Sequence, residues 1–479
     1  MMEFSDLHCT WKTGAAGNLR RRSPRAASGL RWSGIAAMLL AAALAGCVRY
    51  HPRPLSARAV AQSLRDPVHA ALVREAARLR MQPLAPVHLD FSRPLSTREL
   101  GVIAVLANPD LVTLRARERV ASAQVFAAGL LPDPVVTAQG LSPYGPQAAG
   151  RSTAYNAGFL FGLSRLFARP ALLRIARDSA RATRYRVVWQ EWVVANQARL
   201  LGTRLYWLRR SRAAADAAAH VARHYAAAAQ RALRAGAFSQ AGSATAEALA
   251  LSAEETAADY ARQVLRTRIA LNAMLGLKPV DRLRIAHPDT VPARLPPASG
   301  LLQAAIRRRF DLVALRAAYA ASENRLDLAV LQQYPQLDIG LVAARNTTGV
   351  TSAGWQVSLT LPLSGNRGAI AVTRARRAVL YHAYLARIAH VRSDIYRLRA
   401  IFTGVSTEIE RIGPRERRLG RMQAPVLAAQ KSGALGARRA LLLVLAGAQA
   451  REQYGNLRML QAQSYIGLTV ASGGRWRNR

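Results

Sequence analysis

A short segment of this sequence returns 201 residues later, and the features that follow it return in the same order. The stretch Asp110–Ala116 reads DLVTLRA, and Asp311–Ala317 reads DLVALRA. Each copy continues with a helical pattern up to a proline and then two strand-like runs. A long helical stretch follows and is interrupted at a glycine, Gly236 or Gly433. Repeated units of this kind bury their apolar faces against one another. We therefore predict a mainly α chain with a small β part, built from a duplicated unit of helix, β-hairpin, long helix and return helix.

The composition favours long packed helices. Hydrophobic residues make up 51% of the chain and aromatic residues only 6%, because alanine and leucine are so common. No proline occurs in the 108 residues from Ala171 to Lys278, and apolar residues recur there at heptad-like spacing. A helix from Ala171 to Leu233 would be about 95 Å long. Its charged residues exclude a lipid-facing span, so we expect it to project into water. A second long helix is expected from Gly368 to Gln430.

Alternation of apolar and polar residues predicts four strands. Gly354–Leu361 and Gln336–Leu341 alternate without a break, and Val135–Gln139 and Ala154–Leu163 occupy the same places in the first copy. A period of two sends apolar side chains to one face of a strand and polar ones to the other. The expected lipid-facing residues are Phe159, Phe161, Leu163, Leu337, Ile339, Leu341, Trp355, Val357 and Leu359.

Such strands need a closed sheet. An open sheet cannot face lipid with unpaired edges, whereas outer-membrane barrels are closed and alternate lipid-facing with lumen-facing residues. Four strands per chain are too few, since about eight is the smallest barrel. We therefore expect oligomerisation, and three copies would supply about 12 strands.

The N-terminal region resembles a secretory signal. A basic stretch precedes the apolar run Ile35–Ala45, which is too short to cross a bilayer. The following Leu44–Cys47 reads LAGC and resembles the bacterial lipobox. We expect residues 1–46 to be a lipoprotein-type signal peptide and Cys47 to carry lipid, including a fatty acid such as palmitate. The alternative is an ordinary signal peptide with an incidental cysteine.

Prolines and repeat positions suggest the domain boundaries. Six prolines fall within residues 48–96, so we predict a lipidated extended arm over 47–96 with one short helix near Val68–Arg80. A helix is expected from Thr97 to Gly129. The remaining predicted parts are a first structural repeat at 97–290, a second at 291–470 and a short C-terminal tail at 471–479.

The net charge of the chain does not by itself decide between classes of function. The formal net charge is +41, which invites a nucleic-acid partner. The arginines are spread along every predicted helix, without interleaved aromatics or a recognisable nucleic-acid-binding motif. We therefore expect no nucleic-acid partner. Phosphate-binding glycine loops, catalytic elbows and carboxylate dyads are absent from the sequence, so we expect neither an enzyme nor a cofactor. His220 and His224 lie four residues apart without a third ligand, and we expect no metal site.

Several short motifs together resemble the TolC-like outer membrane factors, also called outer membrane efflux proteins, of the lipoprotein type. The resemblance extends from about Cys47 to Leu468 and depends on the order and spacing of motifs that are weak singly. The motifs are the lipobox, Tyr50–Pro54, Asn108–Leu111, Leu131–Pro134, Leu271–Gly276, Phe310–Leu312, Tyr334–Leu337, Leu361–Leu363 and Gly365–Gly368.

This resemblance implies a homotrimer with a 12-stranded outer-membrane β-barrel on a periplasmic α-helical coiled-coil barrel. It also implies a function, the passive exit duct of a tripartite efflux pump for small solutes. An inner-membrane efflux transporter and a periplasmic adaptor (membrane fusion) protein would be its partners, together with outer-membrane lipid. The alternatives are a type I secretion duct for polypeptides and a lipid-anchored periplasmic coiled-coil scaffold without transport.

In this family the hairpin tips close the aperture and dock the adaptor. The matching segments here are Arg231–Ser239 and Lys431–Arg439, and the expected tip residues are Arg234, Gly236, Phe238, Ser239, Gly433, Leu435, Arg438 and Arg439. Some members have acidic residues just beyond the second glycine, where this chain has arginines. Three copies of Arg439 facing a narrow pore would favour anionic substrates. The alternative is an arginine that faces outward or pairs with a neighbouring helix.

Overall fold

The computed structural model describes residues 49–63, 69–78 and 87–474. The chain divides into two units, Met1–Arg65 and Asp66–Arg479, and each is described by itself. In the first unit, residues 57–63 form the short helix α2 (Ala57–Ser63). The predicted signal peptide and Cys47 lie outside the described residues, as do the last five residues of the predicted tail.

Elements of the same kinds follow one another in the same order in the two halves of the second unit. After α3 (His69–Arg78), the first half contains α4 (Thr97–Ala107), α5 (Pro109–Gly129), β1 (Val135–Leu141), the 3-10 turn η1 (Pro146–Ala148), β2 (Ala154–Gly162), α6 (Leu163–Arg234) and α7 (Gln240–Met274). The second half contains α8 (Ala298–Arg308), α9 (Phe310–Leu331), β3 (Gln336–Arg345), β4 (Thr351–Thr360), α10 (Arg367–Lys431) and α11 (Ala437–Ala471). The mainly helical class is confirmed, and duplication as the origin of this order stays a prediction.

The helix that we predicted from Thr97 to Gly129 is wrong as a single helix, because it is divided at Asn108. Asn108 has φ −65° and ψ 123°, which is extended backbone. The residue before a proline is disfavoured in the α region, and Pro109 follows. The Asn108 side-chain oxygen accepts hydrogen bonds from the backbone N–H groups of Asp110 and Leu111 at 3.0 and 3.2 Å. Asn108 therefore ends α4 and caps α5.

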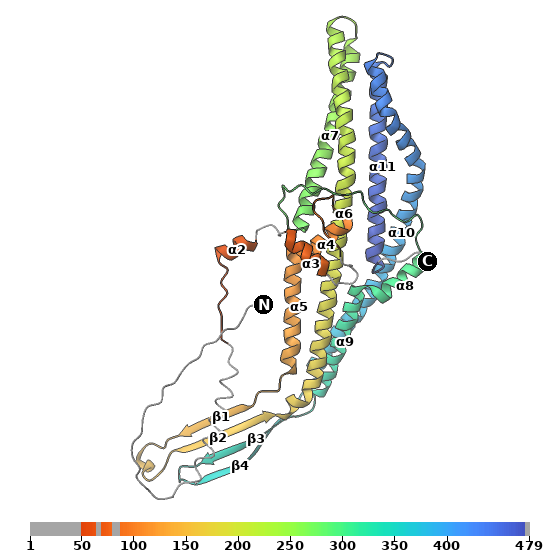
Figure 1. Cartoon of the computed structure of the whole chain (residues 1–479). Helices are drawn as coiled ribbons and strands as arrows, with labels where there is room; N and C mark the ends of the chain where they lie inside the picture. The colour runs from red at the N-terminus through yellow and green to blue at the C-terminus, as the bar shows by residue number, and fades with distance from the viewer. Residues whose placement is uncertain (1–48, 64–68, 79–86, 475–479) are drawn as a thin grey trace. The chain divides into compact units, whose positions relative to one another are not determined.

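Two very long helices connect the sheet with the far hairpin turns (Figure 1). Helix α6 has 72 residues and α10 has 65, which correspond to about 108 and 98 Å of helix. Helix α6 begins before Pro170, eight residues earlier than predicted. The assignment of Leu163 to a strand is therefore wrong: β2 ends at Gly162, and Leu163 is the first residue of α6.

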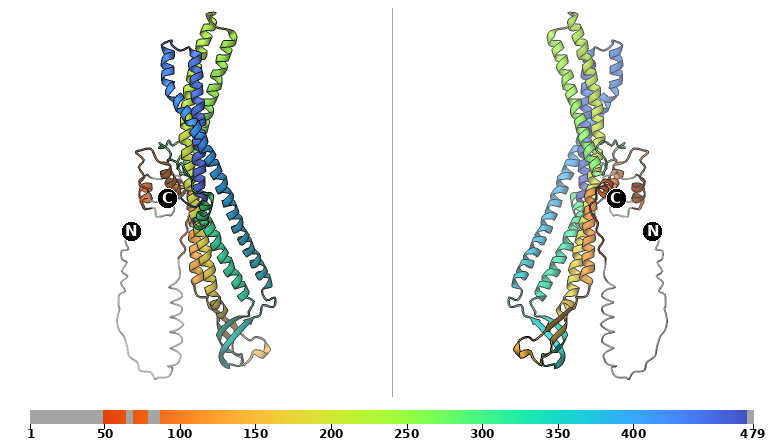
Figure 2. Two further views of the ribbon diagram at one scale, coloured as in Figure 1. Left: turned by 90° about the vertical axis from the view of Figure 1, so that its right-hand side faces the viewer. Right: turned by 90° about the vertical axis from the view of Figure 1, so that its left-hand side faces the viewer.

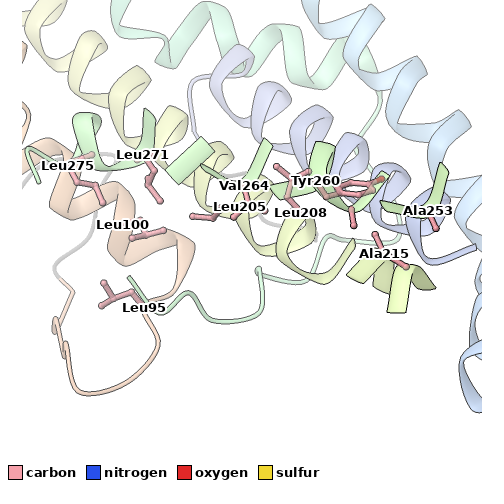
Figure 3. Packing of buried hydrophobic residues seen from close by; sticks show 14 of the residues in the cluster. Leu95, Leu100, Leu205, Leu208, Ala215, Ala253, Tyr260, Val264, Leu271 and Leu275 are labelled. Atoms are coloured by element: carbon pink, nitrogen blue, oxygen red, sulfur yellow. The ribbon is translucent and has the colours of Figure 1, made fainter. Parts of the chain in front are cut away.

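Small residues form the interface between α6 and α7. Alanines 215, 219, 222, 226 and 229 of α6 and alanines 246, 250, 253 and 257 of α7 are buried in one apolar cluster. Larger residues, among them Leu205, Leu208, Tyr260, Val264 and Leu271, fill the same cluster nearer the middle of the unit (Figure 3). Alanine side chains let the two helices approach closely in the part of the interface that leads to the turn.

The N-terminal segment also contributes to this cluster. Leu72, Ala76, Leu89 and Leu95 are buried in it, and Leu95 forms a parallel β-bridge with Ile285. Helix α3 confirms the short helix predicted near Val68–Arg80. The predicted arm nevertheless contains a second helix, α2, that we did not expect.

The four strands form one antiparallel sheet in the order β1-β2-β3-β4. The sheet lies beyond the ends of α5 and α9, at the start of α6 and α10, as the two side views show (Figure 2). Sequence-distant halves meet there, because β2 pairs with β3 along the register Tyr155↔Arg345 to Gly162↔Asp338. The sheet and the helical hairpin turns therefore occupy opposite ends of α6 and α10.

Candidate functional site

One face of the sheet carries apolar side chains in rows across the strands. Phe159 pairs with Leu341, which pairs with Trp355. Directly opposed residues of an antiparallel pair point to the same face. The neighbouring row contains Phe161, Ile339 and Val357, and Leu337 pairs with Leu359. The structure thus brings together on one face eight of the nine predicted residues, all except Leu163.

This apolar face is open to the surroundings in the single chain. Trp355 is 79% exposed and Leu341 66%, although both are large and apolar. Val136, which pairs with Phe159, is 74% exposed and extends the face onto β1. We did not predict Val136, because the adjacent Val135 hides the alternation in β1. An exposed apolar surface of this kind marks contact with lipid or with another protein.

The opposite face of the sheet is more polar, although Val135, Leu141, Leu160 and Val342 also lie on it. It carries Thr137 and Gln139 of β1, Asn156 of β2, and Gln356 and Ser358 of β4, according to the strand register. Its one charged residue among the described strands is Asp338. The sheet thus has one apolar face and one more polar face.

Within the described part of the chain, no further strand pairs with either edge of this sheet. Strand β1 pairs with β2 alone and β4 with β3 alone. The outer N–H and C=O groups of both edge strands are therefore available for pairing with another chain. Among the helices of the described residues, none is both long and apolar enough to cross a bilayer.

The first hairpin turn joins α6 to α7. Gly236 has φ +69°, in the left-handed region that favours glycine. The N–H of Ala237 donates to the carbonyl of Ala232 at 2.8 Å and closes the end of α6. Ser239 caps α7, because its hydroxyl accepts from the N–H of Gly242 at 3.1 Å. Phe238 is half-buried against the apolar cluster of α6 and α7, whereas Arg234 is exposed.

The second turn joins α10 to α11 and is built in the same way. Gly433 has φ +78°, and the N–H of Leu435 donates to the carbonyl of Ala429 at 3.0 Å. Leu435 packs on a small apolar cluster formed by residues of α6, α10 and α11. The N-cap Gly436 supplies no side-chain hydrogen bond to α11. The structure therefore puts each of the eight predicted tip residues in or beside one of the two turns.

Arg438 and Arg439 lie in the first turn of α11 and are exposed. Neither has an ion pair with any of the described residues. Arg231 and Lys431, which we did not single out, are also exposed beside the turns. The tips are thus basic surfaces.

No cluster of three or more potential metal ligands occurs in the part of the chain that the structure describes. The Nε2 atoms of His220 and His224 lie 3.2 Å apart, and both side chains are exposed. This distance suits a hydrogen bond between the two rings, in which one ring donates and the other accepts.

No protein-family model matches this sequence, and no curated protein matches it. Solved structures do match. The outer membrane protein VceC of Vibrio cholerae is 16% identical with a TM-score of 0.62 and covers 79% of this chain and 96% of its own. The outer-membrane channel OprN is 14% identical with a TM-score of 0.64, and the match covers 90% of this chain and 99% of OprN. The CmeC outer membrane channel of Campylobacter jejuni is 13% identical with a TM-score of 0.65, and the match covers 79% of this chain and 85% of CmeC.

Each of these alignments covers more than three quarters of this chain. Two of the three, OprN and CmeC, are outer-membrane channels. On this likeness, the chain has the fold of the TolC-like outer-membrane channels.

Proposed function

We propose that this protein is the outer-membrane channel of a tripartite efflux pump, a passive exit duct for small solutes. The observation that carries the proposal is the sheet, which has an apolar face, a more polar face and two edges with no partner strand among the described residues. In lipid, the backbone N–H and C=O groups of the two edge strands find hydrogen-bond partners when copies of the sheet join edge to edge. The apolar face then points outward to lipid, and the more polar face surrounds a lumen.

The strand order supports closure by identical copies. Successive strands alternate in direction, so β4 of one copy is antiparallel to β1 of the next when the sheets continue around a ring. Four strands are too few, since about eight form the smallest barrel. Three copies of this four-stranded sheet would supply 12 strands. The homotrimer is therefore part of the proposal, and outer-membrane lipid is the partner of the apolar face.

The long helices would continue the duct into the periplasm. The exposed sides of α6 and α10 carry many arginines, together with apolar residues such as Phe167 of α6 and Val379 of α10, and both helices extend far beyond the sheet. Three copies would place their hairpin turns around the far end of the duct, where a periplasmic adaptor would dock and connect it to an inner-membrane transporter. Residues proposed for this docking are Arg234, Gly236, Phe238, Ser239, Gly433, Leu435, Arg438 and Arg439.

The proposal includes membrane targeting by the N-terminal region. A signal peptide at residues 1–46 and a lipid on Cys47 would anchor the arm of residues 47–96 to the outer membrane. The two repeats, 97–290 and 291–470, and the tail from 471 complete the proposed organisation.

The experiment is recovery of the full-length protein from outer-membrane fractions, followed by electrophoresis with and without heating. We expect a heat-modifiable trimer, and purified trimers should form channels in planar lipid bilayers. Trp355→Lys, which puts a charge on the apolar face, should reduce recovery in the membrane, because a charge facing the bilayer midplane costs about 2–4 kcal/mol. Gln356→Lys, one residue along on the polar face, is the matched control and should leave recovery unchanged. A soluble monomer, or equal effects of both variants, would favour a periplasmic scaffold and contradict the channel.

A further inference from the structure

The ends of both helical hairpins contain no carboxylate. We define the distal hairpin ends as residues 217–246, around the turn between α6 and α7, and residues 417–451, around the turn between α10 and α11. Asp216 and Glu247 border the first end, and Glu416 and Glu452 border the second. Ten basic residues lie between these borders, and no Asp or Glu does.

Most of these basic residues have no acidic partner in the part of the chain that the structure describes. Arg223 pairs with Glu254 at 3.4 Å, and Arg451 pairs with Glu416 at 3.9 Å. The other eight are exposed, and none forms an ion pair with the described residues. They are Arg231, Arg234, Arg417, Arg418, Arg421, Lys431, Arg438 and Arg439.

Helix stability does not account for the arginines at the start of α11. The N-terminus of a helix carries partial positive charge, so acidic residues stabilise the first turn and basic residues destabilise it by about 0.3–1 kcal/mol. Helix α11 has Arg438 and Arg439 in this turn, no acidic residue there, and Gly436 as an N-cap without a side-chain bond. The positive charge at this turn therefore adds to the positive end of the helix.

We infer that the channel selects anionic solutes at its periplasmic entrance, an inference that rests on the proposed function. In that function the distal hairpin ends surround the solute path. Whichever side of the hairpins borders the path, it presents basic or neutral side chains and no carboxylate. A narrow passage bordered by one sign of charge concentrates ions of the opposite sign.

The magnitude favours a strong effect in a narrow entrance. The last 15 residues of α10 before its turn contain no carboxylate and span about 23 Å. Screening in physiological salt acts over about 8 Å, so charges on the wall of a narrow entrance act on every ion within it. Three copies would contribute 24 of the exposed basic residues, three times the eight of each chain.

The test is the reversal potential of the purified full-length trimer in a planar bilayer with a roughly tenfold gradient of potassium chloride. We expect chloride to permeate at least about threefold better than potassium. The double variant Arg438→Glu/Arg439→Glu should reduce this preference or reverse it.

The matched control is Arg307→Glu/Arg308→Glu. These two arginines are also adjacent and exposed, but they lie at the end of α8, far along the chain from both turns. The control makes the same change in net charge, so it should leave the permeability ratio unchanged if position matters. Equal shifts in both double variants would overturn the assignment to the distal hairpin ends.

A second measurement, which does not depend on ion conduction, tests the same inference if the channel inserts into the bilayer but carries no current. In a Ser432→Cys variant, a negatively charged thiosulfonate reagent should react faster than a positively charged one, and Arg438→Glu/Arg439→Glu should remove the difference. A conducting channel that prefers potassium, or a faster reaction with the cationic reagent, would overturn the inference and leave the basic residues as a docking surface for an acidic protein. Failure to insert into the bilayer as a trimer would instead contradict the proposed function.

Discussion

Asp311, just after the start of α9, is held between two guanidinium groups. Arg309 and Arg387 each donate to its carboxylate at 2.7 Å, and the side chains of Arg309 and Asp311 are only 3% and 12% exposed. Burial raises the pKa of this carboxyl, but the hydrogen bonds and charges of the two arginines outweigh burial, so the pKa lies below its usual value. Arg309 is itself fixed, since it donates to the carbonyl of Ala471 at 3.0 Å and lies over the ring of Trp189.

We expect Asp311→Asn to lower the stability of the folded protein by about 3 kcal/mol at pH 7, because Arg309 would remain buried without its anion. A carboxyl with a lowered pKa stabilises the folded state above its unfolded pKa, about 3.9, and this contribution is lost as the pH falls through the lower folded value. The difference between wild type and variant should therefore shrink below about pH 4. Melting followed by circular dichroism between pH 3 and pH 7 would measure it.

Glu191 of α6 provides the matched control. It is 5% exposed and has one guanidinium partner, Arg115, at 2.7 Å. Burial raises the pKa of Glu191 above its usual value, and the hydrogen bond and charge of Arg115 do not compensate for it. A raised pKa means that stability falls as the pH rises above about 4.3. Relative to Glu191→Gln, wild type should lose stability with rising pH, opposite in sign to Asp311. The same sign in both series would contradict this account.

Residue-level contacts such as these could not be predicted from the sequence. Asp311 stands out in the repeated segment, but its partner Arg387 is 76 residues away and is one of many arginines. The apolar sheet face was predictable, because apolar and polar residues alternate along the strands that contain Ile339 and Trp355, and alternate residues of a strand point to opposite faces. Val136 was missed because both it and its neighbour are apolar.

At the scale of elements, α4 packs against α6 at two glycines. A Cβ on Gly101 would lie 2.9 Å from the backbone oxygen of Ala195, and a Cβ on Gly202 would lie 2.5 Å from the Leu100 side chain. The backbone of α6 cannot move away from Gly101 without opening this contact. The short helix is therefore held where only glycine fits.

We expect Gly101→Ala to destabilise the protein by about 1–3 kcal/mol, the usual range for an overpacked core. Gly404→Ala is the matched control, because Gly404 is exposed within α10 and a Cβ there meets nothing within 4 Å. Alanine in a helix interior is favoured over glycine by about 0.5–1 kcal/mol, so this variant should be slightly more stable. If the melting temperatures of both variants changed in the same direction and by the same amount, the close contact at Gly101 would not be the cause.

Sequence predicted which elements exist better than where they end. The proline-free stretch from Ala171 gave the long helix, and the turn glycines Gly236 and Gly433 gave both hairpins. The start of α6 could not be found, because Pro170 suggested a boundary that the structure does not have. The division at Asn108 was signalled by the proline after it, but the apolar pattern on both sides concealed it.

On the scale of the whole molecule, the proposed ring makes a geometric demand on the edge strands. Neighbouring strands in a sheet lie about 4.8 Å apart. Ala138 near the middle of β1 and Ala353, Trp355 and Val357 of β4 share the apolar face, as the register shows. Within one chain β1 and β4 are separated by two intervening strands. A disulfide between them must therefore join two copies.

We expect Ala138→Cys, combined in turn with Ala353→Cys, Trp355→Cys or Val357→Cys, to form oxidised dimers and trimers in at least one pairing, because one register must bring the two Cα atoms within about 7 Å. Electrophoresis without reductant would measure them. In a closed ring of three copies, the largest cross-linked product is a trimer. Copies that join edge to edge without closing a ring would give a ladder of bands that continues to larger oligomers. Ala138→Cys with Ala343→Cys is the control, since Ala343 lies directly across β2 on the same face, about 10 Å away, too far for a disulfide. A ladder beyond trimer would contradict the closed ring, and so would a control that cross-links as well as the edge pairs.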